Sequence, residues 1–87
     1  MENKTMNYAV VFTYDFGDEV SVYLFPNEPA AKKFLADSYK EELRIDTEEN
    51  GWKSCGFINK EGTYAKIETF FEDHSDVTEM RIGTIYQ

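Results

Sequence analysis

The side chains best suited to covalent chemistry in this sequence are one cysteine and one histidine. Cys55 and His74 would form a thiolate–imidazolium pair if the fold brought them together, because a nearby base lowers the pKa of a nucleophilic thiol. The stretch from Lys53 to Gly56 carries no catalytic signature, and no third residue is placed to orient the imidazole. We therefore interpret Cys55 as a small residue that fills space in or near the core.

Two aspartates, Asp73 and Asp76, flank His74 and Ser75 and could together attract a divalent cation. Metal sites usually need three or four well-placed ligands, and the chain has neither a Glu-x-x-His motif nor paired Cys and His spacings. Asp and Ser also favour turns through their own side-chain hydrogen bonds, which makes 72–76 a connecting loop. We expect no metal site and no cofactor.

Adjacent carboxylates occur at Glu41 with Glu42 and at Glu48 with Glu49. Acid–base catalysis needs one carboxyl whose pKa is raised in an apolar cleft, whereas neighbouring acids at a helix end or turn are more often solvated. The five glycines are isolated, so the chain has no Gly-rich phosphate-binding loop. We expect a protein without enzymatic activity.

Charge is the strongest signal, because seventeen acidic residues stand against nine basic ones and give a net charge of −8 on 87 residues. Such a surface repels nucleic acids and anionic membranes, since binding to nucleic acid depends on neutralising phosphates. It favours basic protein partners instead. Direct binding to nucleic acid or membrane is therefore not expected.

Two clusters of acids lie next to aromatic side chains and are the candidate partner-binding surfaces. The first belongs to the last expected hairpin and its loop, and it consists of Glu68, Glu72, Asp73, Asp76 and Glu79 with Tyr64 and Phe70. The second belongs to the expected helix end and the turn after it, and it consists of Glu41, Glu42, Asp46, Glu48 and Glu49 with Trp52. Carboxylates attract a basic partner over long range, and aromatic side chains add affinity at contact.

This pattern predicts an inhibitor that imitates nucleic-acid charge and occupies a basic groove of a DNA- or RNA-binding protein, such as a nuclease. In size and charge the chain resembles, by analogy, the anti-CRISPR and anti-restriction proteins of phages and mobile elements, although it shares no motif with any one of them. The alternative is a generic interaction module or a homodimer that pairs sheet faces or edge strands, with an acidity that serves only solubility. A dimer would depend on Tyr23, Phe25 or Tyr64 and not on the acids.

A compact α+β domain is expected over residues 1–87, with a short polar leader at 1–7. Residues 8–14 and 20–25 are rich in β-branched and aromatic side chains around a turn at 15–19, which predicts a β-hairpin.

Asn27 is the predicted N-cap of an amphipathic helix that runs to about Ile45 or beyond and ends at Asn50-Gly51. Strands are expected at 52–58, with a break at Gly56, and then at 63–71 and 77–86. The order β-β-α-β-β-β predicts an antiparallel sheet with the one helix packed on one face, a two-layer α+β sandwich.

The expected strands alternate, but their second face is not uniformly polar. Val20, Val22 and Leu24 share one face, and Tyr23 and Phe25 lie on the opposite one. In the fourth strand, Tyr64 and Phe70 share a face with Lys66 and Glu68. Since one helix cannot cover both faces of such a sheet, we expect the second face to expose aromatic side chains beside charges.

A lone cysteine excludes an intramolecular disulfide and suits a reducing compartment. The N-terminal residues lack the basic-then-apolar pattern of a secretion signal, and no apolar run approaches the roughly 18 residues of a membrane span. We expect a soluble cytoplasmic protein.

Overall fold

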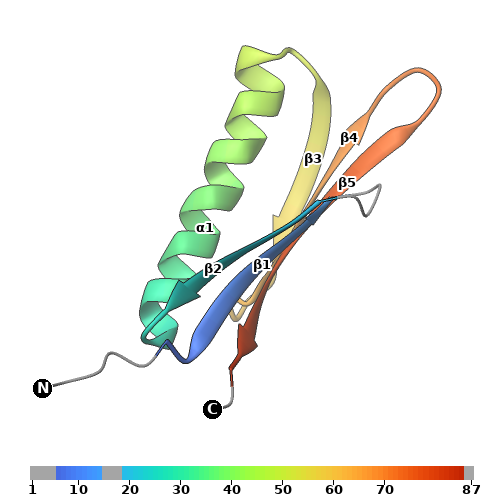
Figure 1. Ribbon diagram of the computed structural model, residues 1–87. Coiled ribbons are helices and arrows are strands. Elements are labelled where there is room, and N and C mark those ends of the chain that lie inside the picture. Colours follow the sequence, from blue (N-terminus) through green and yellow to red (C-terminus); the bar gives the residue numbers. More distant parts are fainter. Residues whose placement is uncertain (1–5, 15–18, 86–87) are drawn as a thin grey trace, which may run out of the picture.

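The described part of the chain forms a sheet of five antiparallel strands with one helix packed against one of its faces (Figure 1). The computed structural model describes residues 6–14 and 19–85. The predicted two-layer α+β sandwich and the element order β-β-α-β-β-β are confirmed. Most of the expected leader at 1–7, most of the first turn, and Tyr86 lie outside the described residues. The elements are β1 (Tyr8–Tyr14), β2 (Val20–Phe25), α1 (Glu28–Arg44), η1 (Ile45–Glu49), β3 (Lys53–Ile58), β4 (Tyr64–Phe70) and β5 (Ser75–Thr84).

The strands are ordered β2-β1-β5-β4-β3 across the sheet. The first strand therefore pairs with the last, with Val10 opposite Ile82 and Phe12 opposite Met80. The loop expected at 72–76 is shorter than predicted, because β5 already begins at Ser75 and Phe71 N donates to His74 O across a tight turn.

The helix begins where its cap was predicted. The Asn27 side chain accepts a hydrogen bond from the Ala30 amide at 2.9 Å, which satisfies a backbone donor in the first turn. Past Arg44 the helix continues as the wider π-helical segment η1, and the chain then turns at Gly51, whose φ of 69° suits glycine.

The core lies between α1 and the sheet. Ala31 and Leu35 from the helix are fully buried against the middle three strands. The buried residues of this cluster are Val10, Phe12, Ala31, Leu35, Ala65, Ile67 and Met80. Thr69 is also buried on this face and is polar.

In β2 the aromatic side chains face the helix and the aliphatic ones lie on the open face, which is the reverse of the expected arrangement. Tyr23 and Phe25 point to the helix, where their rings lie 4.9 Å and 5.0 Å from the ring of Phe34. The side chains of Val22 and Leu24 lie on the open face and are 53% and 52% exposed. The expectation of an open face with aromatic side chains therefore fails for β2, but it holds for β4, where Phe70 is exposed opposite Lys53 of β3.

Two expectations for β3 were wrong. The strand runs without a break through Gly56, which faces the helix beneath Tyr39. Because side chains alternate along a strand, Cys55 then lies on the open face, where it is exposed and fills no space in the core.

Candidate functional site

The first predicted acidic cluster is divided between two faces of the β4–β5 hairpin. Glu68 and Glu79 lie on the open face, because they alternate with the buried residues of their strands. Asp76 lies on the helix face opposite Thr69, and Glu72 and Asp73 occupy the exposed turn. The sheet therefore does not gather these acids into one surface.

On the open face, Glu79 is held by neighbours from its own sheet. It accepts a hydrogen bond from the Tyr64 hydroxyl, which raises the pKa of Tyr64, and it lies 3.3 Å from the guanidinium of Arg81. That guanidinium in turn lies over the Tyr64 ring, 5.3 Å from its centroid, and Lys66 is directly opposite Glu79 in β4. Basic groups thus balance this part of the predicted surface.

Glu68 is likewise held by a neighbour in the same sheet. Its carboxylate accepts a hydrogen bond from the Ser75 hydroxyl at 3.1 Å. Exposed Phe70 lies at the end of the same strand, opposite Lys53 of β3. Of the first cluster, the turn residues retain the most accessible charge.

The second predicted cluster is ordered by ion pairs and hydrogen bonds at the end of the helix. Arg44 bridges Glu41 and Glu49, each at 2.7 Å. Asp46 accepts a hydrogen bond from the Thr69 hydroxyl at 3.1 Å, and it lies 3.5 Å from the Ser54 hydroxyl. Asp46 therefore links the end of the helix to the sheet, and exposed Glu48 follows it after Thr47.

The turn of the first cluster and the helix end of the second lie toward the same end of the molecule (Figure 1), and a contact between Trp52 and Phe71 joins the segments next to them. The rings of Trp52 and Phe71 make a T-shaped contact with their centroids 5.3 Å apart, and the Phe71 ring stacks on His74 with a centroid distance of 4.9 Å. In the same region, Asp46 accepts a hydrogen bond from Thr69, the strand partner of Asp76. We call this region the acidic end; its acids are Glu41, Asp46, Glu48, Glu49, Glu72, Asp73 and Asp76. Glu42 of the second cluster instead lines a groove between the helix and the sheet.

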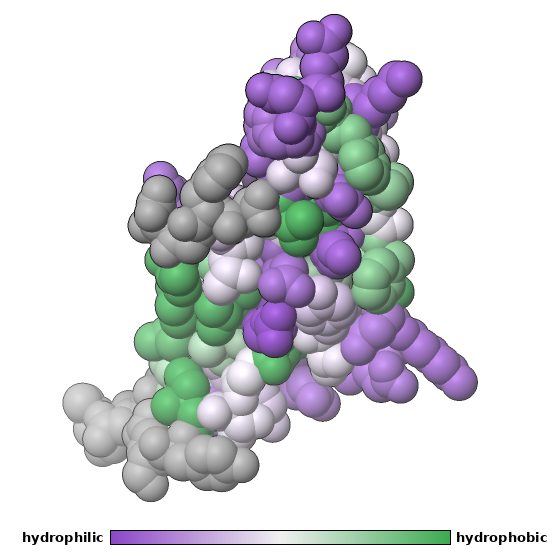
Figure 2. Space-filling view, turned by 90° about the vertical axis from the view of Figure 1, so that its right-hand side faces the viewer, coloured by the Kyte–Doolittle hydropathy of each residue, from purple (hydrophilic) through white to green (hydrophobic). Residues whose placement is uncertain are grey.

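The open face of the sheet has a different character at its other edge. Figure 2 shows hydrophilic side chains gathered toward the end of the β4–β5 turn and hydrophobic ones along the edge that β2 forms. The latter include Val20, Val22 and Leu24.

A search of protein-family models, curated proteins and solved structures finds no match to this chain. Its function is therefore inferred from its own residues.

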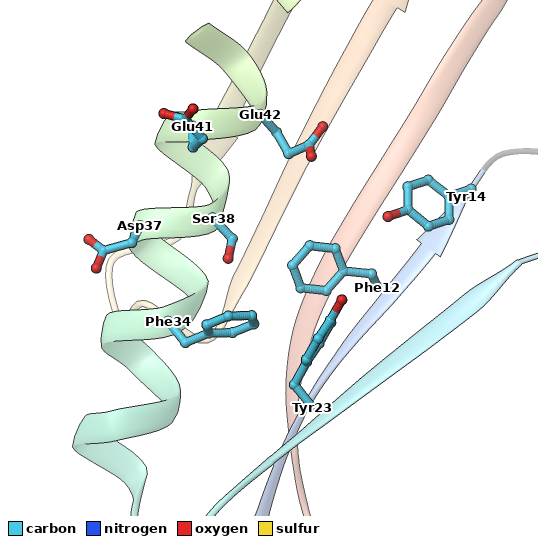
Figure 3. A pocket seen from close by; sticks show the side chains of 8 residues that line it. All are labelled: Phe12, Tyr14, Tyr23, Phe34, Asp37, Ser38, Glu41 and Glu42. Carbon is cyan, nitrogen blue, oxygen red and sulfur yellow. The ribbon is translucent and has the colours of Figure 1, made fainter. Parts of the chain in front are cut away.

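A groove that the sequence-based predictions missed lies between α1 and the β1–β2 hairpin, with a volume of about 350 Å³ (Figure 3). The strands and the helix are close at Phe34 and diverge toward Tyr14. The groove is lined by Phe12, Tyr14, Tyr23, Phe34, Asp37, Ser38, Glu41 and Glu42. The signal for it was on the helix, where Ser38 and Glu42 follow Phe34 at steps of four and interrupt the apolar stripe.

The carboxylates at the rim of this groove differ in their pairing. Asp37 is bound to Lys33 at 2.7 Å and Glu41 to Arg44, and both acids point away from the rings in Figure 3. Glu42 points toward the sheet, and its carboxylate has no hydrogen-bond or ion-pair partner among the described residues. Burial raises the pKa of Glu42, with further contributions from Asp46 and Glu41, and burial and Glu42 raise the pKa of Tyr14.

The groups considered for covalent or metal chemistry are not assembled into a site in the parts of the chain described. His74 Nδ1 is 2.6 Å from Asp73 Oδ1, and this hydrogen bond lowers the pKa of Asp73. Within residues 6–14 and 19–85, no three His, Cys, Asp or Glu side chains are grouped to hold a metal ion. Over the same residues, no helix is both long and apolar enough to cross a membrane.

Proposed function

We propose that this protein is a non-catalytic binding protein whose acidic end occupies a basic surface of a partner protein. The observation that carries the proposal is the meeting of two acidic segments, far apart in sequence, around Trp52, whose side chain is 44% exposed. Exposed aromatic side chains ringed by charge are typical of interaction surfaces, and concentrated charge speeds association with an oppositely charged partner.

The proposed partner is a DNA- or RNA-binding protein, and the acidic end acts as a mimic of nucleic-acid charge. In support, several of its carboxylates are held in place: Arg44 fixes Glu41 and Glu49, and the Thr69 hydroxyl fixes Asp46. Carboxylates that are already ordered lose less conformational entropy on binding than mobile ones. Inhibition of a nuclease, as anti-CRISPR or anti-restriction proteins achieve, is the specific form of this proposal.

Neutralising exposed acids of the acidic end is the test. The triple variant Glu48→Gln, Glu72→Gln, Asp73→Asn is expected to lower affinity for the partner about tenfold, because each exposed ion pair contributes up to about 1 kcal/mol. The measurement is retention of lysate proteins on the tagged protein, washed at about 50 and about 300 mM salt and quantified by mass spectrometry, since screening weakens such contacts.

The matched control removes the same charge elsewhere, with Glu19→Gln, Glu28→Gln and Glu61→Gln, all at exposed positions. It should retain the partner as the native protein does. Equal losses from both triple variants would show that only net charge matters, and retention that ignores salt would contradict the proposal.

A homodimer is the second candidate function, and exposed apolar side chains on the edge strand β2 favour it. Val22 and Leu24 lie beside Val11 of β1 on the open face, and among residues 6–14 and 19–85 no strand pairs with the outer edge of β2. A dimer would use this surface, because Tyr23 and Phe25 pack toward the helix. If the protein forms this dimer, its molecular mass in sedimentation should rise with protein concentration. The variant Val22→Lys should sediment as a monomer at every concentration. A mass of the native protein that does not change with concentration would exclude the dimer.

A further inference from the structure

We infer that the groove between α1 and the β1–β2 hairpin binds the guanidinium of an arginine side chain from the partner. This inference rests on the proposed function, in that the partner is basic, and it adds a contact that the acidic end does not include. It follows from the ring geometry, from the pairing of the rim carboxylates and from the shape of the groove.

The rings of Phe12, Tyr23 and Phe34 form the floor and one wall of the groove. Tyr23 and Phe34 are 4.9 Å apart and inclined by 49°, and Phe12 lies 5.6 Å from Tyr23. Tilted rings present both faces and edges to the space between α1 and the hairpin (Figure 3). The face of an aromatic ring attracts a cation that comes within about 6 Å of its centroid.

Charge in the groove is contributed by Glu42. The other rim acids are compensated within the helix, Asp37 by Lys33 and Glu41 by Arg44. A carboxylate that is partly desolvated and lacks a partner is destabilised, as the raised pKa of Glu42 indicates. An incoming cation would compensate this charge, whereas an apolar occupant would bury it further.

The form of the groove favours arginine over other cations. It is open to solvent along one side and has a volume of about 350 Å³, near the lower end of ligand pockets, so a side chain can enter from outside. A guanidinium is planar, stacks on aromatic rings and donates paired hydrogen bonds to one carboxylate. A lysine ammonium is more strongly hydrated and has no flat surface that can stack on an aromatic ring.

The experiment is an NMR titration of the full chain with a blocked Gly-Arg-Gly peptide, compared with the same peptide carrying lysine or citrulline. Citrulline keeps the shape of arginine without its charge. We expect the arginine peptide to shift the ring resonances of Tyr23 and Phe34 and the amide of Glu42. The lysine peptide should bind more weakly, and the citrulline peptide should shift these resonances little.

The variant Glu42→Gln is expected to weaken arginine-peptide binding about tenfold, because a charge-assisted hydrogen bond is lost. The control Glu28→Gln removes an acid at the far end of the helix and should leave binding unchanged. Folding is not at risk: the raised pKa of Glu42 means that its charge costs stability once the pH rises through that pKa. At neutral pH, Glu42→Gln should therefore be at least as stable as the native protein.

Equal shifts with the arginine and citrulline peptides, or unchanged binding by Glu42→Gln, would overturn the inference. So would shifts that spread over the acidic end and leave Tyr23 and Phe34 unmoved. These results are separate from the test of the proposed function, which depends on Glu48, Glu72 and Asp73. A partner lost from that triple variant but indifferent to Glu42→Gln would refute the groove alone, and the reverse result would refute the acidic end.

Discussion

Gly56→Val is expected to destabilise the fold by about 3 kcal/mol, because β3 and the helix meet too closely at Gly56 for a side chain. A Cβ atom there would lie 2.6 Å from the backbone oxygen of Lys66 and 3.0 Å from Cε1 of Tyr39. The Lys66 oxygen belongs to the neighbouring strand β4, so it cannot move without disturbing the pairing of the two strands. The Tyr39 ring would have to leave the sheet.

Urea unfolding followed by the fluorescence of Trp52, the only tryptophan, measures this effect. Gly83→Val is the matched control, because a Cβ atom at Gly83 in β5 meets no atom within 4 Å. The control should unfold close to the native midpoint. If the two variants shared one midpoint, the close packing of Tyr39 on Gly56 would be wrong.

Leu35→Ala is expected to cost about 2–5 kcal/mol, since it leaves a cavity at the centre of the helix–sheet interface. Leu35 is fully buried and faces the sheet together with Ala31. The matched control is Leu24→Ala, which removes the same atoms from the open face of β2 and should cost less than about 0.5 kcal/mol. Thermal unfolding of both variants at several protein concentrations is the measurement.

Measuring both variants at several protein concentrations also tests whether a second copy of the protein covers the open face of β2. In a monomer, Leu24→Ala behaves as a surface substitution at every concentration. A loss that grows with protein concentration would mean that a second copy covers β2 and would favour the homodimer. A loss as small for Leu35→Ala as for Leu24→Ala would contradict the core described above.

The elements of this fold could be predicted from local signals. Asn27 followed by acidic Glu28 and Pro29 marks the start of the helix, and its apolar spacing predicts the packed face. In β4, Ala65, Ile67 and Thr69 alternate with polar neighbours, and the structure buries those three.

The orientation of β2 could not be predicted, because both of its faces are apolar. Val22 and Leu24 are as hydrophobic as Tyr23 and Phe25, and only contact with Phe34 of the helix selects the aromatic face. The faces of Cys55 and Gly56 were difficult to predict for a related reason. A shift of one residue in the alternation of a strand moves every side chain from the core face to the exposed face or back.

The candidate sites depended on tertiary arrangement even more strongly. The acids at 68–79 and those at 41–49 were predicted as separate surfaces, and the contact between their segments depends on the packing of Trp52 against Phe71. The groove likewise needs β1 and β2 to diverge from the helix, which no local pattern encodes. Glu49 likewise reaches Arg44 only because η1 continues the helix past that residue.

The pairing of β1 with β5 has a consequence for the order in which the protein forms during synthesis. β1 is made before the other four strands described here, yet its place in the sheet lies between β2 and β5, the last of these strands to be made. Until β5 emerges, the β1–β2 and β3–β4 pairs remain separate and each has an unpaired inner edge. Such contacts between distant segments slow folding and prolong exposure of strand edges. The middle of the sheet, which is the most buried part of the finished molecule, is therefore the last to close.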